Sequence, residues 1–151
     1  PEVLVGISPA GDIEKNREQL YADAARWGEE EGYVDYLLPQ LYYGFENSAS
    51  PFEETARQWA ELIRCDSVKL YAGLAIYKSG KEDPYAGPES EGKQGPQYEW
   101  INNCDILSRQ VNWARKTKPY TGFALYSYQY AFGDSLSNSL QKEWNSLKNI
   151  L

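Results

Sequence analysis

VDYLLPQLY, residues 34–42, is the stretch that points most clearly to the fold. It is short, largely apolar or aromatic, and it does not alternate strictly between apolar and polar residues. Such a run is typical of a strand that is buried on both faces of a parallel sheet. Three more runs share this character: VLVGI (3–7), VKLYAGLAI (68–76) and GFALYS (122–127). The sequence therefore predicts four parallel strands, with Gly6 and Gly73 at points where backbone or ligand approaches closely.

Helical patterns alternate with these runs. Apolar residues recur at helical spacing over four ranges: 17–31, 51–65, 97–118 and 135–151. Leu20 belongs to the apolar stripe of the first range, while Ser50 and Asp134 are the candidate N-caps of the second and fourth. Cys65 and Cys104 fall in different predicted helices without CxxC spacing, so we expect two buried free thiols.

The order β-α-β-α-β-α-β-α predicts an α/β fold, either a doubly wound sheet or a (β/α)₈ barrel. Four strands are few for an open sheet with two covered faces, and SPAGD (8–12) lacks the GxGxxG spacing of a dinucleotide site. We therefore expect four consecutive βα units that form half of a TIM barrel, folded as a single domain over residues 1–151. Its two open sheet edges need a cover, either a missing N-terminal barrel half or a second copy of the chain.

One long insertion, KSGKEDPYAGPESEGKQGP (78–96), follows the third strand. Its Gly, Pro and charged residues predict an exposed, mobile loop. Because it follows a strand, it extends from the face on which (β/α)₈ enzymes carry their active sites. Its carboxylates are expected to be solvated: Glu82, Asp83, Glu89 and Glu91.

The carboxyl ends of the four strands, here called the rim, gather aromatic and hydrogen-bonding side chains. A sugar needs such groups, because its hydroxyls bind polar partners and its apolar ring faces stack on aromatic rings. An alternative is that about half of the tyrosines only pack between strand ends and helices. The rim residues are Ser8, Pro9, Gln40, Tyr42, Tyr43, Phe45, Tyr77, Lys78, Ser127, Tyr128, Gln129 and Tyr130. The candidates for substrate binding among them are Ser8, Gln40, Tyr42, Tyr43, Tyr77, Lys78, Ser127 and Tyr128.

Composition excludes several functions. The formal net charge is −7 and no Lys/Arg cluster occurs, which argues against nucleic-acid binding. No apolar run is long enough to span a membrane. The absence of His removes imidazole bases and His-based metal sites, and we expect neither a metal nor a cofactor. The chain begins with Pro1 and contains no Met, so we expect a processed chain or a fragment.

Paired carboxylates, which glycoside hydrolysis usually requires, are missing from the predicted strand ends. Asp35 lies near the start of its strand, where a structural hydrogen bond is the expected role. Glu46 is the best remaining candidate acid and a weak one. The catalytic residues are therefore unknown and are expected upstream of Pro1.

Several segments together resemble the second half of the bacterial glycosyl-hydrolase-like family ten domain: GISPAG (6–11), YADAARWGEEEGYVDYLLPQLYYGFEN (21–47), PF (51–52), VKLYAGLAIYKSGKED (68–83) and GFALYSYQY (122–130). The resemblance implies that the chain supplies strands five to eight of the barrel, while acids at the end of the fourth strand lie upstream. It also implies an extracellular or cell-envelope location, and a polysaccharide or cell-wall glycan as substrate. The carried-over carbohydrate subsite consists of Ser8, Gln40, Tyr42, Tyr77, Lys78, Ser127 and Tyr128.

Three other functions stay open at this point. The first is a non-catalytic carbohydrate-binding module, and the second is a half-barrel that dimerises to close eight strands. A flavodoxin-like binder of small molecules is the third, and it needs a phosphate site that the sequence does not show.

Overall fold

The fold is given by a computed structural model that describes residues 3–88 and 92–151. Four strands form one all-parallel sheet: β1 (Gly6–Ile7), β2 (Tyr36–Leu37), β3 (Lys69–Leu74) and β4 (Tyr120–Leu125). Their order in the sheet is their order in the sequence. The predicted α/β class and the four parallel strands are confirmed, and the sequential order is consistent with part of a TIM-barrel-like unit.

Three of the strands are shorter than predicted, β2 most of all, while β4 has the predicted length and begins two residues earlier. Pro39 has no N–H to donate to a neighbouring strand, and only an isolated bridge at Gln40 continues the pairing toward Ala10 and Gly73. Beyond it, the Tyr42 N–H turns back to the Gln40 carbonyl at 2.8 Å. Residues 34–42 therefore form a two-residue strand followed by a curled segment.

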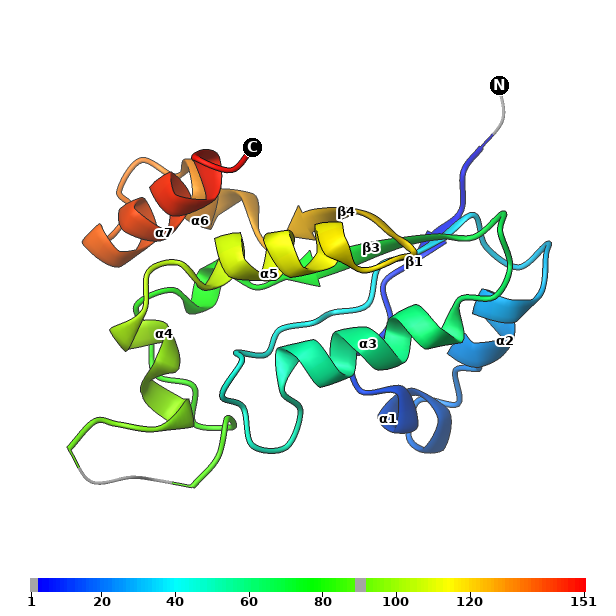
Figure 1. Cartoon of the computed structure of the whole chain (residues 1–151), viewed down its shortest axis with the longest axis horizontal. Coiled ribbons are helices and arrows are strands. Elements are labelled where there is room, and N and C mark those ends of the chain that lie inside the picture. The colour runs from blue at the N-terminus through cyan, green and yellow to red at the C-terminus, as the bar shows by residue number, and fades with distance from the viewer. Residues whose placement is uncertain (1–2, 89–91) are drawn as a thin grey trace.

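Seven α-helices and two 3₁₀ helices occur in the described ranges: α1 (Ile13–Glu18), α2 (Ala24–Glu29), α3 (Phe52–Leu62), η1 (Ile76–Lys78), η2 (Pro96–Tyr98), α4 (Glu99–Asn102), α5 (Ile106–Lys116), α6 (Tyr128–Phe132) and α7 (Asn138–Lys148). The carboxyl ends of β3 and β4 point toward the side where α6 and α7 lie (Figure 1). None of these helices is both long and apolar enough to cross a membrane.

The single helix predicted over 17–31 is wrong, because α1 and α2 take its place. Asp12 and Asp23 each accept a hydrogen bond from a backbone N–H three residues later, so each begins a separate helix. Between them Tyr21 has a φ of 52°, which no helix accommodates. Leu20 consequently lies outside both helices with 53% of its surface exposed, and not on a buried stripe.

The other helix predictions need smaller corrections. Residues 97–118 are divided into η2, α4 and α5, so Cys104 lies in the break before α5; Cys65 lies beyond the end of α3. Both thiols are free and only partly buried. Ser50 does not cap α3; its N–H instead donates to Asn47. Ser137, and not Asp134, caps α7 by accepting from the Leu140 N–H.

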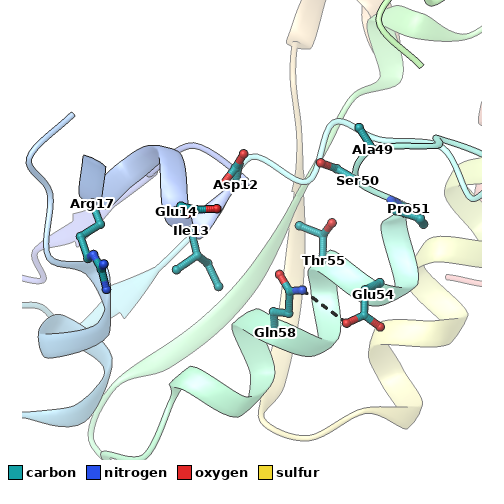
Figure 2. Close-up of a pocket in the computed structure, with 10 residues that line it drawn as sticks. All are labelled: Asp12, Ile13, Glu14, Arg17, Ala49, Ser50, Pro51, Glu54, Thr55 and Gln58. Carbon is teal, nitrogen blue, oxygen red and sulfur yellow. Dashed lines mark hydrogen bonds between the residues drawn. The ribbon is translucent and has the colours of Figure 1, made fainter. Parts of the chain in front are cut away.

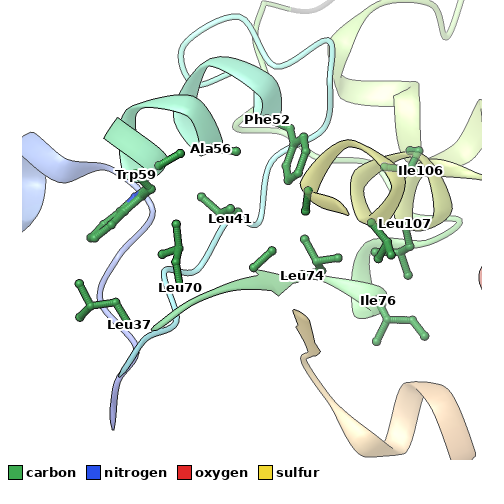
Figure 3. Close-up of a cluster of buried hydrophobic side chains, with 14 of the residues drawn as sticks. Leu37, Leu41, Phe52, Ala56, Trp59, Leu70, Leu74, Ile76, Ile106 and Leu107 are labelled. Carbon is green, nitrogen blue, oxygen red and sulfur yellow. The ribbon is translucent and has the colours of Figure 1, made fainter. Parts of the chain in front are cut away.

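The hydrophobic core lies between one face of the sheet and the helices α3 and α5 (Figure 3). Leu37, Leu70 and Leu74 point to this side and are fully buried. They meet Trp59 of α3 and Leu107 of α5, among others. Trp59 also donates its indole N–H to the Gly11 carbonyl at 2.6 Å, which ties α3 to the segment after β1.

The opposite face of the sheet has a different character. Side chains alternate along a strand, so Tyr36 and Tyr71 point away from the core side, and both are partly exposed. Their rings meet edge to face at 5.6 Å. Gly6 and Gly122 leave room for them, since a Cβ at either position contacts Tyr36 or Tyr71. The predicted burial on both faces therefore holds only at the carboxyl end of β3, where Ala72, Gly73 and Leu74 are all buried, and it is wrong at Tyr36 and Tyr71.

The predicted close approach of backbone is confirmed at Gly73, whereas at Gly6 the close neighbour is the side chain of Tyr36. At Gly73 an added Cβ lies 2.6 Å from the Pro39 carbonyl oxygen, so backbone packs directly on backbone there. Asp35 also has its predicted structural role, because its carboxylate accepts the Val5 N–H at 2.6 Å.

Candidate functional site

Four tyrosines meet at the rim and form the centre of the candidate site. We call Tyr42, Tyr77, Tyr126 and Tyr130 the tyrosine cluster. Tyr42 follows β2, Tyr77 lies in η1 after β3, and Tyr126 and Tyr130 follow β4. Parallel strands bring their carboxyl ends to one edge, which explains why residues so distant in sequence meet.

The rings of the cluster contact one another closely. Tyr42 stacks on Tyr126 with centroids 5.9 Å apart and planes 24° apart. Tyr77 meets Tyr42 at 5.9 Å and Tyr126 at 6.0 Å, both edge to face, and it lies 6.1 Å from Tyr130. Tyr126 keeps 58% of its surface exposed. The cluster therefore offers an aromatic surface to solvent while its inner rings support one another.

Burial raises the pKa of two phenol groups of the cluster. It raises the pKa of Tyr42 to about 12, and the neighbouring Tyr77 and Tyr126 add to the shift. Burial also raises the pKa of Tyr77, and the nearby negative charge of Asp83 raises it further. Neutral phenols are both hydrogen-bond donors and acceptors, which suits uncharged hydroxyl ligands.

The structure places Ser8, Gln40 and Tyr43 apart from the rings of the cluster. The Gln40 amide donates to the Ser8 carbonyl at 3.1 Å, so the two residues are joined, and Ser8 is exposed. Tyr43 turns toward Gly11, and burial together with Asp12 raises its pKa. Tyr43 thus packs beneath the segment after β1 and away from the cluster.

Ser127 and Tyr128 lie at the start of the short helix α6. The Ser127 carbonyl accepts the Tyr130 N–H at 3.0 Å and begins the helix. Tyr128 is 75% exposed and pairs with Phe132 at 5.1 Å, which is itself 57% exposed. Tyr128 and Phe132 thus form a second exposed aromatic pair, on α6.

Lys78 and Asp83 form a buried ion pair next to the cluster. The Lys78 ammonium lies 2.6 Å from the Asp83 carboxylate, and the side chains are 17% and 3% exposed. The carboxylate of Asp83 is therefore buried, and the prediction that solvent surrounds it is wrong. Glu82 is exposed as predicted, while Glu89 and Glu91 lie outside the described residues.

The start of the long insertion is docked and not fully exposed as predicted. Ser79 and Ala86 are buried, and the Ala86 carbonyl accepts both the N–H and the hydroxyl of Ser48. The Gln97 amide donates to the Gly87 carbonyl at 2.7 Å. The bonds from Ser48 join residues 79–88 to the segment between β2 and α3, which carries Tyr42, and the bond from Gln97 joins them to η2.

Glu99, which sequence reasoning missed, holds the same segment from the other side. Its carboxylate accepts the N–H groups of Phe45 and Glu46 at 2.9 and 3.0 Å. It is 2% exposed, and burial raises its pKa. Gly44 lies directly beside it, and an added Cβ there displaces the Glu99 carboxylate. The sequence signal was Gly44 itself, a glycine next to the predicted rim.

A surface cavity of about 540 Å³ lies elsewhere, between α1 and α3 (Figure 2). Asp12, Glu14 and Arg17 line it from one side, and Glu54 and Gln58 from the other. It is an open cavity between two helices and contains no residue of the tyrosine cluster. We therefore place the candidate site at the rim, where the aromatic and hydroxyl groups converge.

The described part of the rim brings no free carboxylate pair into the cluster. Asp83 is taken up by Lys78, and Glu46 is exposed on the segment that Glu99 holds. Within residues 3–88 and 92–151, no group of three or more Cys, Asp or Glu side chains is arranged to hold a metal ion. What these residues can do chemically is bind a polyhydroxylated ring by stacking and hydrogen bonds.

Comparisons with known proteins identify relatives. The model of the family described as Glycosyl hydrolase-like 10 matches residues 1–86. Glycosyl hydrolase DigH of Escherichia coli strain K12 is 35% identical, over 97% of this chain and 35% of DigH. Glycosyl hydrolase YngK of Bacillus subtilis strain 168 is 33% identical, over 93% of this chain and 29% of YngK. The chain thus spans about a third of the length of these relatives.

Proposed function

The chain belongs to the glycosyl hydrolase-like 10 family, and from that premise we propose that it is part of a glycoside hydrolase whose carbohydrate substrate binds along the rim. The observation that carries the proposal is the tyrosine cluster at the carboxyl edge of a parallel sheet. Aromatic faces with adjacent neutral hydroxyls match the alternating apolar faces and hydroxyl edges of a sugar. In this proposal Gln40, which is joined to Ser8, and Ser127 and Tyr128, at the start of α6, supply further polar and aromatic groups along the rim.

The proposal includes a division of labour between this chain and further sequence. A glycosidase needs two carboxylates across the scissile bond, about 5 Å apart when the stereochemistry is retained. The described rim supplies binding groups and no such pair, so we place the catalytic acids outside this chain. The four βα units then form strands five to eight of an eight-stranded barrel. The uncovered face with Tyr36 and Tyr71 becomes part of the barrel interior.

Binding and hydrolysis by two proteins test this proposal. The 151-residue chain and the longer protein that includes it are titrated with cellohexaose, chitohexaose and xylohexaose by calorimetry, and products are followed by chromatography. We expect a saccharide to bind the longer protein and be cleaved, while the chain alone releases no product. Hydrolysis by the chain alone contradicts the placement of the acids.

A non-catalytic carbohydrate-binding module is the second candidate, favoured by the same lack of a carboxylate pair. It predicts that the longer protein binds a hexasaccharide and never cleaves it. Export to the cell envelope or beyond is part of the first proposal and rests on the family resemblance.

A further inference from the structure

The ion pair between Lys78 and Asp83 differs from every other ion pair among the described residues. In the others, each side chain is at least 41% exposed, as expected for surface pairs of little energetic weight. Asp83 is 3% exposed and Lys78 is 17% exposed. A buried pair is costly to break, because removal of one partner leaves the other charge uncompensated away from water.

Asp83 is also a branch point of the backbone hydrogen bonds around it. Its N–H donates to the Gln97 carbonyl at 2.8 Å, and its carbonyl accepts the Ala86 N–H at 3.0 Å. Ala86 in turn accepts the Ser48 N–H at 2.7 Å. Asp83 thereby connects the end of β3 with the segment between β2 and α3.

The partner of Asp83 stands directly after a ring of the tyrosine cluster. Tyr77 and Lys78 are consecutive residues of η1, and the Lys78 N–H donates to the Ala75 carbonyl at 3.2 Å. Fixing the Lys78 ammonium restrains this single turn, and with it the backbone that directs the Tyr77 ring toward Tyr42.

We propose that Asp83 is a positioning residue, which holds Lys78 so that residues 79–88 stay docked and Tyr77 keeps its place in the tyrosine cluster. Its consequence for sugar binding rests on the proposed function, whereas its effect on docking does not. Asp83 contacts no sugar in this proposal; it acts through Lys78 and Tyr77.

The test replaces Asp83 by Asn in the 151-residue chain and in the longer protein. Asp83→Asn keeps the size of the side chain and removes its charge. Glu82→Gln is the matched control, an equal loss of charge at the exposed neighbouring position. Lys78→Met removes the pair from its other side and keeps the aliphatic stem.

Two measurements are made on each variant. In hydrogen exchange, the Ser48 and Ala86 amides exchange at least about tenfold faster in Asp83→Asn and Lys78→Met, because the docked segment opens locally. In the longer protein, affinity for the hexasaccharide falls about tenfold in the same variants. Alkaline titration of tyrosine absorbance shows one group shifted toward its ordinary pKa in Asp83→Asn, which removes the charge that raises the pKa of Tyr77. Glu82→Gln changes none of these quantities.

The outcomes separate the two levels of the proposal. If no hexasaccharide binds the wild-type protein, the proposed function fails, and hydrogen exchange alone decides the positioning role. Equal exchange in Asp83→Asn and Glu82→Gln overturns that role. If both pair variants unfold, the exchange rates of the Ser48 and Ala86 amides in the wild-type protein decide. Rates as fast as those of an open loop overturn the proposal. Rates slowed by protection of these two amides support it.

Discussion

Tyr77 touches the other three rings of the tyrosine cluster, and so its side chain is the most informative one to replace. Tyr77→Ala removes the ring and lowers the affinity of the longer protein for the bound hexasaccharide about tenfold, since an aromatic contact contributes about 0.5–1.5 kcal/mol beyond its buried area. Tyr77→Phe keeps the stacking surface and loses only the hydroxyl, so its loss of affinity is smaller. Calorimetric titration measures both.

Tyr85 supplies the control for that comparison. It lies on the insertion with 89% of its surface exposed, and within the described residues the ring contacts of the cluster do not include Tyr85. Tyr85→Ala leaves the affinity unchanged. If Tyr77→Ala binds as tightly as Tyr85→Ala does, the cluster is not the sugar surface.

Glu143 of α7 controls a pH dependence of stability. Its side chain is fully buried and accepts the Leu107 N–H at 2.6 Å, and burial raises its pKa from 4.5 to about 7. Between these values the folded chain holds a proton that the unfolded chain has released, so the free energy of unfolding falls as pH rises through this window. Above pH 7 the whole penalty, roughly 3 kcal/mol, is present.

Glu143→Gln tests this dependence, because the amide oxygen still accepts from Leu107 and carries no charge. Urea denaturation at pH 4.5 and pH 8 measures both proteins, with the exposed Glu61→Gln as reference. Between pH 4.5 and pH 8 the free energy of unfolding of the wild type falls by on the order of 3 kcal/mol more than that of the variant. Equal pH profiles for Glu143→Gln and wild type contradict an uncharged, buried Glu143 at low pH.

At the scale of elements, the start of α7 separates two candidate caps. Ser137 accepts the Leu140 N–H, whereas Asp134 lies exposed three residues before it. Ser137→Ala lowers the free energy of unfolding by about 1 kcal/mol, the usual weight of a lost N-cap. Asp134→Ala leaves it unchanged within a few tenths of a kcal/mol. Denaturant titrations of the two variants decide, and the reverse order of effects contradicts the observed cap.

The same scale shows what the sequence could predict. The sequence predicts the four strands from their short, largely apolar runs. It also predicts the three eleven-residue helices α3, α5 and α7, because their apolar spacing extends over several turns. The sequence predicts one helix over 17–31, whereas α1 (Ile13–Glu18) begins earlier and α2 (Ala24–Glu29) is separate, because only Asp12 and Asp23 mark the two starts. Helix boundaries depend on such local caps, which periodicity does not report.

The candidate site was predictable only where strand ends determine position. Tyr42 and Tyr77 follow strands that lie side by side, so their meeting follows from the topology. The orientation of Tyr43 toward Gly11 and the pairing of Lys78 with Asp83 depend on loop conformation, for which the sequence shows no periodic signal. Glu99 escaped notice because a helical carboxylate is normally solvated, and here a tertiary contact with Phe45 and Glu46 buries it.

At the scale of the molecule, the core is one-sided. Leu70 and Leu74 are fully buried under α3 and α5 (Figure 3). Tyr71, between them in β3, is partly exposed and points to the uncovered face, since side chains alternate along a strand. A sheet with one covered face buries only part of its apolar surface, and its two open edges leave backbone N–H and C=O groups unpaired. This asymmetry, together with the share of the relatives that the chain spans, supports the proposal that further strands complete the sheet.

Tyr71 provides the measurement at this scale. In a completed barrel its ring is enclosed, so Tyr71→Ala lowers the free energy of unfolding of the longer protein by roughly 3–5 kcal/mol, as large-to-small changes in cores do. In the 151-residue chain the ring is partly exposed, and the same change has a clearly smaller effect. Tyr33→Ala, at a side chain that is 42% exposed, serves as the reference in both proteins. Denaturation of the four variants, with sedimentation to detect pairing of the short chain, gives the answer. An equal loss in both proteins, without pairing, means that nothing encloses this face and that the half-barrel proposal is wrong.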